Sequence, residues 1–288
     1  AQYRDQGTRV VIICLGQENK RIEQDNVVVY YYKAPQIFSY MNLNKHASPM
    51  KMLWHLFDIY NIFAAKGIKA ILEKEHVFLV HTHNLMGLGF LLPKMIHSLG
   101  LQHKHTVHDV QLVDPSGILP WNHTKDSWLQ KWHSNIMKKK FASVDEVIFP
   151  SQFMQDFYTK RGFFSQANLF VDISDLSKEK AIKIKHTNKK LLFVGSLATH
   201  KGIGTLMQIW EQLGLVGKDD MELHIVGDGE LHEHVTAWAK RDHRIVVYGR
   251  LDTEKVYELY KESSVLLFTS TCIENRPNVI IEALRFGL

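Results

Sequence analysis

Residues 191–202 read LLFVGSLATHKG, which is an apolar strand, a glycine turn and the beginning of a helix. Two more apolar strands end in glycine turns, LHIVGDG at 223–229 and IVVYG at 245–249, and a further strand, VLLFTS, follows at 265–270. Helical patterns separate these strands. Because short apolar strands that alternate with helices are typical of a parallel, doubly wound sheet, we expect an α/β domain over residues 191–288.

The N-terminal half shows the same alternation. Apolar strands are expected at residues 10–15, 27–32, 77–81, 105–108 and 146–151, and helices at residues 50–73, 87–99 and 128–141. This pattern predicts a second doubly wound unit. Residues 176–190 are rich in lysine and poor in aromatic side chains, which indicates a linker. We therefore expect an N-terminal domain at 1–175, a linker at 176–190 and a C-terminal domain at 191–288.

The last fifteen residues, ENRPNVIIEALRFGL, carry two glutamates, Glu274 and Glu282, with seven residues between them. Glu282 lies in an apolar run, where burying a carboxylate is costly unless a donor hydrogen-bonds to it. Pro277 suits the first turn of a helix, so we expect a buried helix to begin at Asn278. Because a helix start offers free N–H groups to a phosphate, the segment predicts a sugar-nucleotide site. The alternative is an ordinary helix start with one acid in the preceding loop.

Four motifs in order, G-x-L-x-x-x-K-G from residue 195, I-V-G-D-G from 225, V-Y-G from 247 and E-x7-E from 274, resemble the donor-binding half of the retaining GT-B glycosyltransferases of family 4. The N-terminal half is similar to that family through V-H-x-H at 80–83, T-x-H at 106–108 and the strand at 148–153. The resemblance implies an α/β, GT-B fold: two Rossmann-like, doubly wound parallel-sheet domains that face each other across a cleft.

The activity implied by the resemblance is transfer of a hexose from a nucleotide diphosphate sugar to a hydroxyl acceptor, with retention of configuration and without a metal. The leaving phosphate would help to deprotonate the acceptor on the same face of the sugar. The acceptor would be a saccharide or a lipid-linked molecule, as in polysaccharide biosynthesis. The alternatives are a fragment that binds nucleotide sugar without transferring it and a nucleotide-sugar epimerase of the same architecture.

The resemblance also gives the motif residues their roles. Lys201 would neutralise the leaving diphosphate, Glu274 would hold the hydroxyls of the donor sugar, and Glu282 would accept hydrogen bonds from the ribose. His108 would face the donor sugar from the first domain. The remaining donor-binding residues would be Gly195 and Ser196 in the first turn, Asn278 and Val279 through backbone N–H groups, and Gly249 and Arg250 at the base.

Each of these roles has a structural alternative. Lys201 and Glu274 could be solvated surface residues, and Glu282 could pair with a nearby base such as Arg285. His108 could be satisfied by a local carbonyl group. The donor-binding roles require that the fold brings these side chains together, whereas the structural roles do not.

The sequence departs from the family pattern in four places. We expect it to start after the usual first strand and glycine-rich acceptor loop, and it stops at Gly287-Leu288. Ser196 stands where an arginine is common, and no asparagine-glycine turn occurs near Asp172. We therefore expect a chain truncated at both ends, with weakened diphosphate affinity and little transferase activity.

Five histidines, His81, His83, His103, His105 and His108, lie close together in the sequence. Alternation along a strand sends neighbouring side chains to opposite faces, so His81 and His83 share a face. No third ligand has the spacing of a zinc site, and no D-x-D pair ends a strand. We expect neither a metal nor a cofactor.

Composition narrows the partners. The 288 residues carry a net charge of +5 and a pI near 9.0, which suits nucleotide diphosphates or anionic lipid, and no motif indicates nucleic acid. No apolar run is long enough to span a membrane. The two cysteines, Cys14 and Cys272, indicate a reducing compartment, so we expect a cytoplasmic protein, either free or peripheral on the inner face of the membrane.

A basic amphipathic helix at residues 128–141 could make the membrane contact. Its apolar face would hold Trp128, Leu129, Trp132, Ile136 and Met137. The alternative, which we favour, is a helix that packs this face on its own domain and leaves its lysines in solvent.

Overall fold

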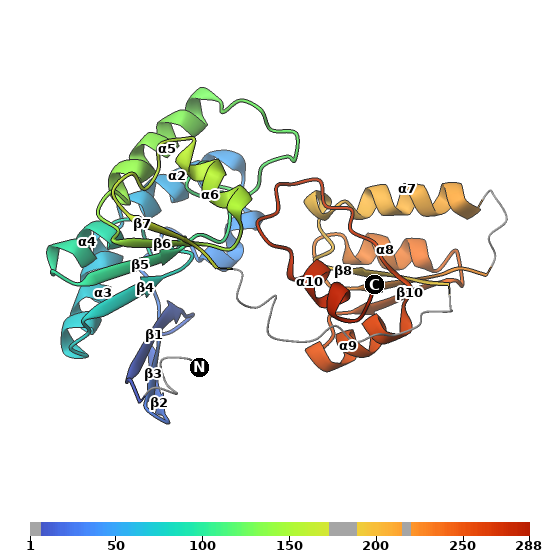
Figure 1. Ribbon diagram of the computed structural model, residues 1–288, viewed down its shortest axis with the longest axis horizontal. Coiled ribbons are helices and arrows are strands. Elements are labelled where there is room, and N and C mark those ends of the chain that lie inside the picture. Colours follow the sequence, from blue (N-terminus) through green and yellow to red (C-terminus); the bar gives the residue numbers. More distant parts are fainter. Residues whose placement is uncertain (1–6, 173–188, 215–219) are drawn as a thin grey trace. The chain divides into compact units, whose positions relative to one another are not determined.

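The computed structural model describes residues 7–172, 189–214 and 220–288, which form two compact units (Figure 1). Unit 1 comprises Ala1–Gly117 and Asp126–Asp172, and unit 2 comprises Ile118–Lys125 and Ile173–Leu288. Most of the predicted linker, residues 176–188, lies outside the described residues. Its last residue, Lys190, begins a strand instead.

Unit 1 is built around a four-stranded parallel sheet. The strands, in their order across the sheet, are β4 (Leu79–Thr82), β5 (Gln102–Thr106), β6 (Glu146–Phe149) and β7 (Asn168–Val171). Helices α4 (Leu92–Ser98), α5 (Trp128–Lys140) and α6 (Gln152–Thr159) connect consecutive strands. Val147 and Phe149 of β6 are fully buried, as expected of a central strand covered by helices. The expectation of a parallel sheet in this half is confirmed.

A second, three-stranded sheet in unit 1 contains an unexpected strand. Its order is β1 (Val10–Leu15), β3 (Val27–Tyr32) and β2 (Lys20–Gln24), with β1 parallel and β2 antiparallel to β3. Strand β2 is exposed along its whole length, so no apolar pattern marks it in the sequence. The hairpin signal lies in Asp25-Asn26, which both adopt positive φ angles, the conformation that a two-residue turn of this type requires.

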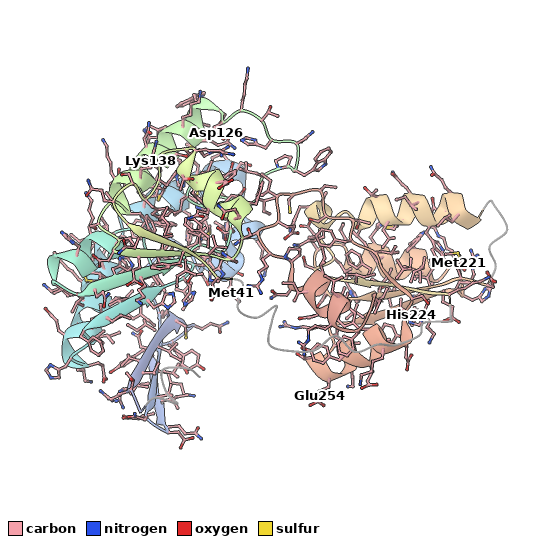
Figure 2. The ribbon with its side chains drawn as sticks, in the orientation of Figure 1. Met41, Asp126, Lys138, Met221, His224 and Glu254 are labelled. Atoms are coloured by element: carbon pink, nitrogen blue, oxygen red, sulfur yellow. The ribbon has the colours of Figure 1, made fainter. Side chains whose placement is uncertain are left out.

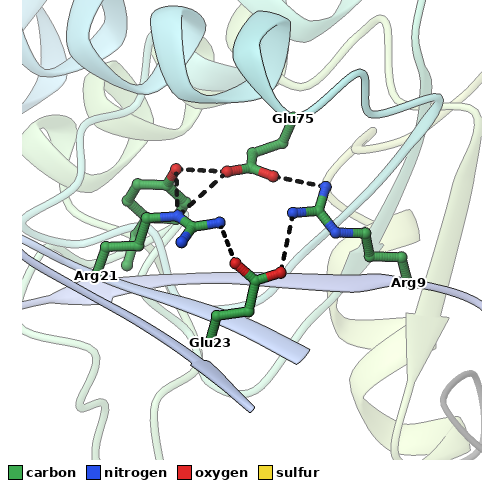
Figure 3. A network of polar contacts seen from close by, with 5 residues as sticks. Arg9, Arg21, Glu23 and Glu75 are labelled. Atoms are coloured by element: carbon green, nitrogen blue, oxygen red, sulfur yellow. Dashed lines mark hydrogen bonds and ion pairs between the residues drawn. The ribbon is translucent and has the colours of Figure 1, made fainter. Parts of the chain in front are cut away.

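A network of charges fastens this sheet to α3 (Ile62–Lys74), as Figure 3 shows. Glu75, the buried residue that ends α3, accepts a hydrogen bond from Tyr30 Oη at 2.5 Å and pairs with Arg9 at 2.7 Å. Arg21 approaches the same carboxylate at 3.5 Å, and Glu23 contacts both arginines. The hydrogen bond from Tyr30, together with the two arginines, holds the pKa of Glu75 below its ordinary value. The buried carboxylate is therefore fully compensated where sheet and helix meet.

The expected helix over residues 50–73 is two helices, and that prediction was wrong. α2 (Ser48–Ile59) ends at Tyr60, and α3 begins after Asn61. Asn61 Oδ1 accepts from Ala64 N at 2.9 Å, which caps α3, while its Nδ2 donates to the Pro35 carbonyl at 2.7 Å. An asparagine that can cap a new helix competes with continuation of the old one. Ahead of α2, residues Tyr40–Lys45 form the short 3-10 helix η1, whose Met41 side chain is exposed (Figure 2).

The two helices that follow in sequence also differ from expectation. α4 begins at Leu92 rather than at residue 87, because Gly87 and Gly89 adopt positive φ angles in a preceding turn. In α5, the expected apolar face is only partly buried: Met137 is buried, but Trp128, Leu129 and Trp132 are exposed. Polar residues of α5 are buried instead, because their side chains have interaction partners inside unit 1. His133 Nε2, for example, lies 2.9 Å from the Gln111 carbonyl.

Unit 2 contains a four-stranded parallel sheet with helices on both faces. The order is β10 (Ile245–Gly249), β9 (Glu222–Val226), β8 (Lys190–Val194) and β11 (Val265–Leu266). Helices α7 (Ile203–Gly214) and α8 (His232–Ala239) pack on one face through Trp210 and Trp238, whereas α9 (Thr253–Glu262) and α10 (Asn278–Arg285) pack on the other through Tyr260 and Phe286 (Figure 1). The doubly wound sheet expected over residues 191–288 is confirmed.

A buried histidine lies within this sheet. His224 of β9, labelled in Figure 2, places Nε2 3.0 Å from Glu222 Oε2 and Nδ1 2.8 Å from Tyr248 Oη. Because a carboxylate can only accept, Nε2 donates to Glu222, while the Tyr248 hydroxyl is the partner of Nδ1. Both ring nitrogens therefore have a hydrogen-bond partner inside the sheet.

Residues 118–125 join unit 2 although they interrupt the sequence of unit 1. Pro120 forms an antiparallel bridge with Cys272. Ile273 N donates to the Leu119 carbonyl at 2.7 Å, and Trp121 N donates to the Thr271 carbonyl at 3.0 Å. The domain predicted from the sequence, 1–175, contained residues 118–125. Their assignment to unit 2 depends on backbone hydrogen bonds between segments far apart in the chain, which leave no local pattern in the sequence.

Gly202 is required between the 3-10 turn at Thr199–Lys201 and the start of α7. It has a φ of +72°, and a Cβ there would lie 1.8 Å from the Thr269 carbonyl oxygen. We expect Gly202→Ala to lower the free energy of unfolding of unit 2 by at least about 3 kcal/mol, because neither backbone can move away. Urea denaturation followed by circular dichroism would measure the change.

Gly204 provides the matched control for this prediction. It is an exposed residue of α7, and a Cβ there would meet nothing within 4 Å. Gly204→Ala should therefore raise the free energy of unfolding by about 0.5–1 kcal/mol. Similar effects of the two substitutions would contradict the role given to Gly202.

Candidate functional site

A pocket of about 270 Å³ opens in unit 2 where β8 and β11 end. The carboxyl ends of parallel strands are the usual place for ligands in sheets of this kind. The residues lining the pocket come from the turn after β8, from the loop after β11 and from the first turn of α10; among them are Gly195, Ser196, Lys201, Thr269, Ser270, Glu274, Arg276, Asn278 and Val279. Six of the donor-site residues expected from the sequence therefore meet at one place.

Lys201 and Glu274 form an ion pair inside this pocket. Lys201 ends the 3-10 turn η3 (Thr199–Lys201), and its Nζ lies 2.6 Å from Glu274 Oε1. The Lys201 side chain is 29% exposed and that of Glu274 is 21% exposed. The two residues are 73 positions apart in the sequence, and nothing in their local patterns predicts that they touch.

Glu274 is held as an anion by the groups around it. Ser270 Oγ donates to Glu274 Oε1 at 2.7 Å, and Cys272 Sγ lies 3.7 Å from the same oxygen. Burial by itself would raise the pKa of Glu274, but the hydrogen bonds from Lys201 and Ser270 outweigh it and keep the pKa below its ordinary value. Burial also raises the pKa of the Cys272 thiol, so the carboxylate is the anionic group of the pair.

The first turn of α10 supplies backbone donors to the pocket. Pro277 precedes the helix without a side-chain cap, and Asn278 and Val279 line the pocket. The first N–H groups of a helix have no intrahelical acceptor and so can bind an anion. The helix is less buried than expected: Ala283 is buried, but Leu284 is 58% exposed. Because α10 packs on α9 by one side, its other apolar residues remain partly exposed.

Arg276 is a pocket residue that the sequence reasoning missed. It lies within the E-x7-E motif, and its side chain lines the same pocket as Lys201 and Glu274. The signal in the sequence was a basic residue beside a proline that begins a helix, close to a candidate phosphate site. The pocket thus contains two cations and one anion.

Glu282 lies in α10 but not among the residues that line this pocket. Tyr260 Oη donates to Glu282 Oε2 at 3.2 Å, and it also lies 3.3 Å from the Val279 carbonyl. Burial and the nearby carboxylate raise the pKa of Tyr260 well above its ordinary value, so the phenol stays protonated and can donate. The partner of Glu282 is thus a tyrosine, and Arg285 packs over the Tyr257 ring.

Gly249 and Arg250 follow β10 and also lie outside the pocket lining. Gly249 has a φ of +69°, and its carbonyl accepts from Gly227 N at 2.8 Å. Arg250 is exposed. The two residues occupy the carboxyl end of the strand at the edge of the sheet, next to the glycine turn after β9.

His108 belongs to a histidine cluster in unit 1. His83 Nδ1 lies 2.9 Å from His108 Nε2, the rings of His81 and His83 are 4.4 Å apart, and His81 Nε2 lies 2.8 Å from Thr106 Oγ1. Burial and the neighbouring histidines lower the pKa of His83 to about 4. His81 and His83 therefore share a face, as expected, and His108, two residues after the end of β5, joins them.

His103 and His105 are fully buried behind this cluster. Thr82 Oγ1 lies 2.8 Å from His103 Nε2 and 2.9 Å from His105 Nδ1. Burial lowers the pKa of His103 to about 4 and that of His105 well below its ordinary value. Within the described ranges, no group of three or more His, Cys, Asp or Glu side chains could hold a metal ion.

The family is established by comparison with known proteins. Residues 1–169 match the model of "Glycosyltransferase Family 4", and residues 188–288 match the model of "Glycosyl transferases group 1". The chain belongs to glycosyltransferase family 4. Among the residues that the structure describes, no helix of this family member is long and apolar enough to cross a membrane.

Curated relatives of this family 4 chain come from bacteria. It is 26% identical over 206 residues to an "Uncharacterized 42.6 kDa protein in cps region" of Klebsiella pneumoniae, a match that covers 69% of this chain and 55% of the relative. It is 28% identical over 159 residues to the amylovoran biosynthesis glycosyltransferase AmsD of Erwinia amylovora, covering 51% and 43%. The chain spans about half the length of these relatives.

Solved structures confirm the fold. A sucrose-phosphate synthase from Thermosynechococcus elongatus matches 98% of this chain and 70% of its own with a TM-score of 0.66 at 17% identity. A UDP-forming trehalose-phosphate synthase from Burkholderia vietnamiensis matches 96% and 74% with a TM-score of 0.62 at 12% identity. Anabaena HepE, solved in complex with UDP, matches 82% and 63% with a TM-score of 0.56 at 16% identity. Both units are Rossmann-like, and the fold is GT-B.

Proposed function

We propose that this protein transfers a hexose from a nucleoside diphosphate sugar to a hydroxyl acceptor, with retention of configuration and without a metal ion. The observation that carries the proposal is the unit 2 pocket, where a cation, an anion and a helix N-terminus meet at the carboxyl ends of parallel strands. A relative named for amylovoran biosynthesis supports a saccharide or lipid-linked acceptor, and HepE with UDP supports a uridine nucleotide.

In this proposal, the cationic side of the pocket binds the donor diphosphate. Lys201 and the N–H groups of Asn278 and Val279 contact the phosphates, and Gly195 and Ser196 leave room for them in the turn after β8. Arg276 adds a second cation. These groups stabilise the charge that builds up on the leaving phosphate as the glycosidic bond breaks. That phosphate then accepts the proton of the acceptor hydroxyl on the same face of the sugar.

The remaining roles concern the sugar and the nucleoside. Glu274 is proposed to accept hydrogen bonds from hydroxyls of the donor sugar, and His108 to contact the same sugar. Glu282, whose carboxylate is oriented by Tyr260, would accept from the ribose hydroxyls. Gly249 and Arg250 would contact the base through the main chain. A cytoplasmic location remains a prediction that rests on the two free cysteines, Cys14 and Cys272.

Calorimetry with UDP, GDP and ADP tests the proposal directly. Lys201→Ala should weaken binding of the preferred nucleotide roughly ten- to hundredfold, because a charge-assisted contact to phosphate is lost. Chelation of divalent cations should leave the affinity unchanged. The control is Lys255→Ala, which removes an exposed lysine of α9 that pairs with Asp252 outside the pocket.

Three outcomes would count against the proposal. An affinity for UDP that Lys201→Ala leaves unchanged would place the nucleotide elsewhere. Nucleotide binding with no hydrolysis or transfer of the bound sugar, in a chain of the relatives' full length, would favour the alternative of a nucleotide-sugar binding protein. Interconversion of donor sugars without an acceptor would favour an epimerase.

A further inference from the structure

A groove between α3 and α4 combines an apolar floor with lysines at its rim. Its volume is about 300 Å³, and Ala65, Leu91 and Met95 contribute to its floor. Lys66, Lys69 and Lys94 also line it, and all three are exposed. The groove belongs to unit 1 and contains none of the donor-site residues. It therefore needs an explanation that the proposed transfer reaction does not supply.

The lysines of this groove are largely uncompensated. Lys69 approaches Glu73 at 3.7 Å along the helix, an exposed pair of the kind that contributes little. For Lys66 and Lys94, the described part of the chain shows no ion pair. Lys140, at the end of α5, is buried beneath the Tyr60 ring, with Nζ 4.3 Å from the ring centre. Burial and the proximity of Lys94 lower the pKa of Lys140 to about 8, which reflects the density of positive charge here.

The surrounding helices are strongly basic. There is one lysine in α2, three in α3, one in α4 and four in α5, against two carboxylates, Asp58 and Glu73. One of those two, Asp58, is buried, and burial raises its pKa to about 7. The excess of positive charge on these four helices is larger than the net charge of +5 of the entire chain. Such a surface is complementary to a surface of anionic groups.

Large apolar side chains are exposed at the start of α3, where Ile62 lines the groove and Tyr60 and Phe63 are its near neighbours in the chain. Tyr60 is 56% exposed, Ile62 is 50% exposed and Phe63 is 60% exposed, although a dissolved anion would gain nothing from them. Ile62 and Phe63 lie one helical turn before Lys66, so apolar and cationic groups alternate along the exposed side of α3. Aromatic and aliphatic side chains next to lysines are typical of protein surfaces that lie in the headgroup region of a bilayer.

We propose that the α3–α4 groove and its rim, Tyr60, Ile62, Phe63, Lys66 and Lys94, dock on a bilayer that carries anionic lipid headgroups. The lysines bind headgroup phosphates, and Ile62 and Phe63 enter the boundary between headgroups and acyl chains. The contact uses the junction of α2 and α3 rather than the exposed tryptophans at the start of α5. It does not depend on the proposed transfer reaction.

Flotation with vesicles tests this surface. The protein should float with phosphatidylcholine vesicles that contain about a third phosphatidylglycerol, and not with phosphatidylcholine alone. The double substitution Lys66→Gln/Lys94→Gln should weaken partition onto the anionic vesicles roughly thirtyfold, because each lysine near such a surface contributes about fivefold. Ile62→Ser/Phe63→Ser should weaken it about tenfold through lost apolar contact.

Matched variants locate the contact. Lys20→Gln/Lys33→Gln removes the same charge from exposed positions on and beside the three-stranded sheet, and should change partition less than twofold. Equal loss in this control, or equal floating with neutral vesicles, would overturn the proposal. So would a loss confined to Trp128→Ser/Trp132→Ser, which would move the contact to the other end of α5. Calorimetric binding of inorganic phosphate that is lost with Lys66→Gln/Lys94→Gln, without vesicle binding, would show a free-phosphate site instead.

The variants also keep this proposal separate from the donor site. All substitutions lie in unit 1 and outside the pocket of unit 2, so the affinity for UDP should stay the same in each of them. Unchanged circular dichroism would show that the variants are folded. Loss of vesicle binding with intact UDP binding in the variants supports the docking surface. If the unsubstituted protein floats with anionic vesicles but binds no UDP, the docking surface stands while the donor proposal fails.

Discussion

Replacing Glu274 by glutamine is expected to tighten the binding of free UDP roughly five- to tenfold while sugar transfer is lost. Lys201 Nζ lies 2.6 Å from Glu274 Oε1, so a diphosphate has to compete with a carboxylate for the same cation. Glutamine removes the negative charge and frees Lys201 for the phosphate. The sugar, in contrast, loses its proposed acceptor. Calorimetry with UDP, together with a donor-dependent transfer assay, would measure both effects.

A control for this experiment lies on the same rim of unit 2. Glu230 Oε1 accepts from Thr199 N at 3.2 Å and from Thr199 Oγ1 at 3.1 Å. Thr199 lies two residues before Lys201 in the chain. Glu230→Gln removes one negative charge without breaking the Lys201–Glu274 pair, and should change the affinity for UDP less than twofold. Weaker or unchanged UDP binding by Glu274→Gln would show that Glu274 does not restrain Lys201.

The buried histidines of unit 1 are expected to lower its free energy of unfolding when the pH is lowered from 7 to 5. His103 is fully buried, and its pKa falls from 6.5 to about 4 in the folded protein. The depressed pKa means that the folded state keeps the ring neutral while the unfolded chain takes up a proton. Stability is therefore complete above pH 6.5 and is lost as the pH falls toward 4. For His103 the loss at pH 5 is about 2 kcal/mol, and His105 adds a loss of the same sign.

Urea denaturation at pH 7 and pH 5 would measure this loss. His103→Gln cannot take up the proton and should reduce the difference between the two pH values by about 2 kcal/mol, whereas His97→Gln, at an exposed position of α4, should not change it. Asp58 works in the opposite direction. Burial raises its pKa to about 7, so it favours the folded state as the pH falls, and Asp58→Asn should make unit 1 more sensitive to acid. An equal difference in His103→Gln and the native protein would contradict this account.

The sheets of both units could be predicted because their strands are covered on both faces. Such strands read as short apolar runs, and β8, β9 and β10 lie within a residue of their expected bounds. Strand β2 could not be predicted in this way, because all of its residues are exposed. The break at Asn61 was missed because a capping asparagine looks like any polar residue of a long helix until its partners, Ala64 and Pro35, are known.

Some members of the pocket could be predicted from the sequence, but Arg276 and the interactions between the members could not. Motif order placed Lys201, Glu274 and Asn278 in one pocket, since strand ends of a parallel sheet converge. The Lys201–Glu274 pair itself depends on the positions of two side chains from separate loops, which no sequence pattern records. The same limit applies to α5, where burial of His133 depends on an acceptor, the Gln111 carbonyl, from a different segment.

The segment 118–125 makes the two units inseparable by a single cut of the chain. The backbone passes between them three times, after Gly117, after Lys125 and after Asp172. A C-terminal piece made by truncation at the linker would lose the Leu119 carbonyl that accepts from Ile273 N and the Trp121 N–H that donates to Thr271, both within three residues of Glu274. Chimeras that exchange donor-binding units between family members therefore need to carry these eight residues across with unit 2. Joining halves at the linker alone would leave the Glu274 loop in contact with residues 118–125 of a different protein.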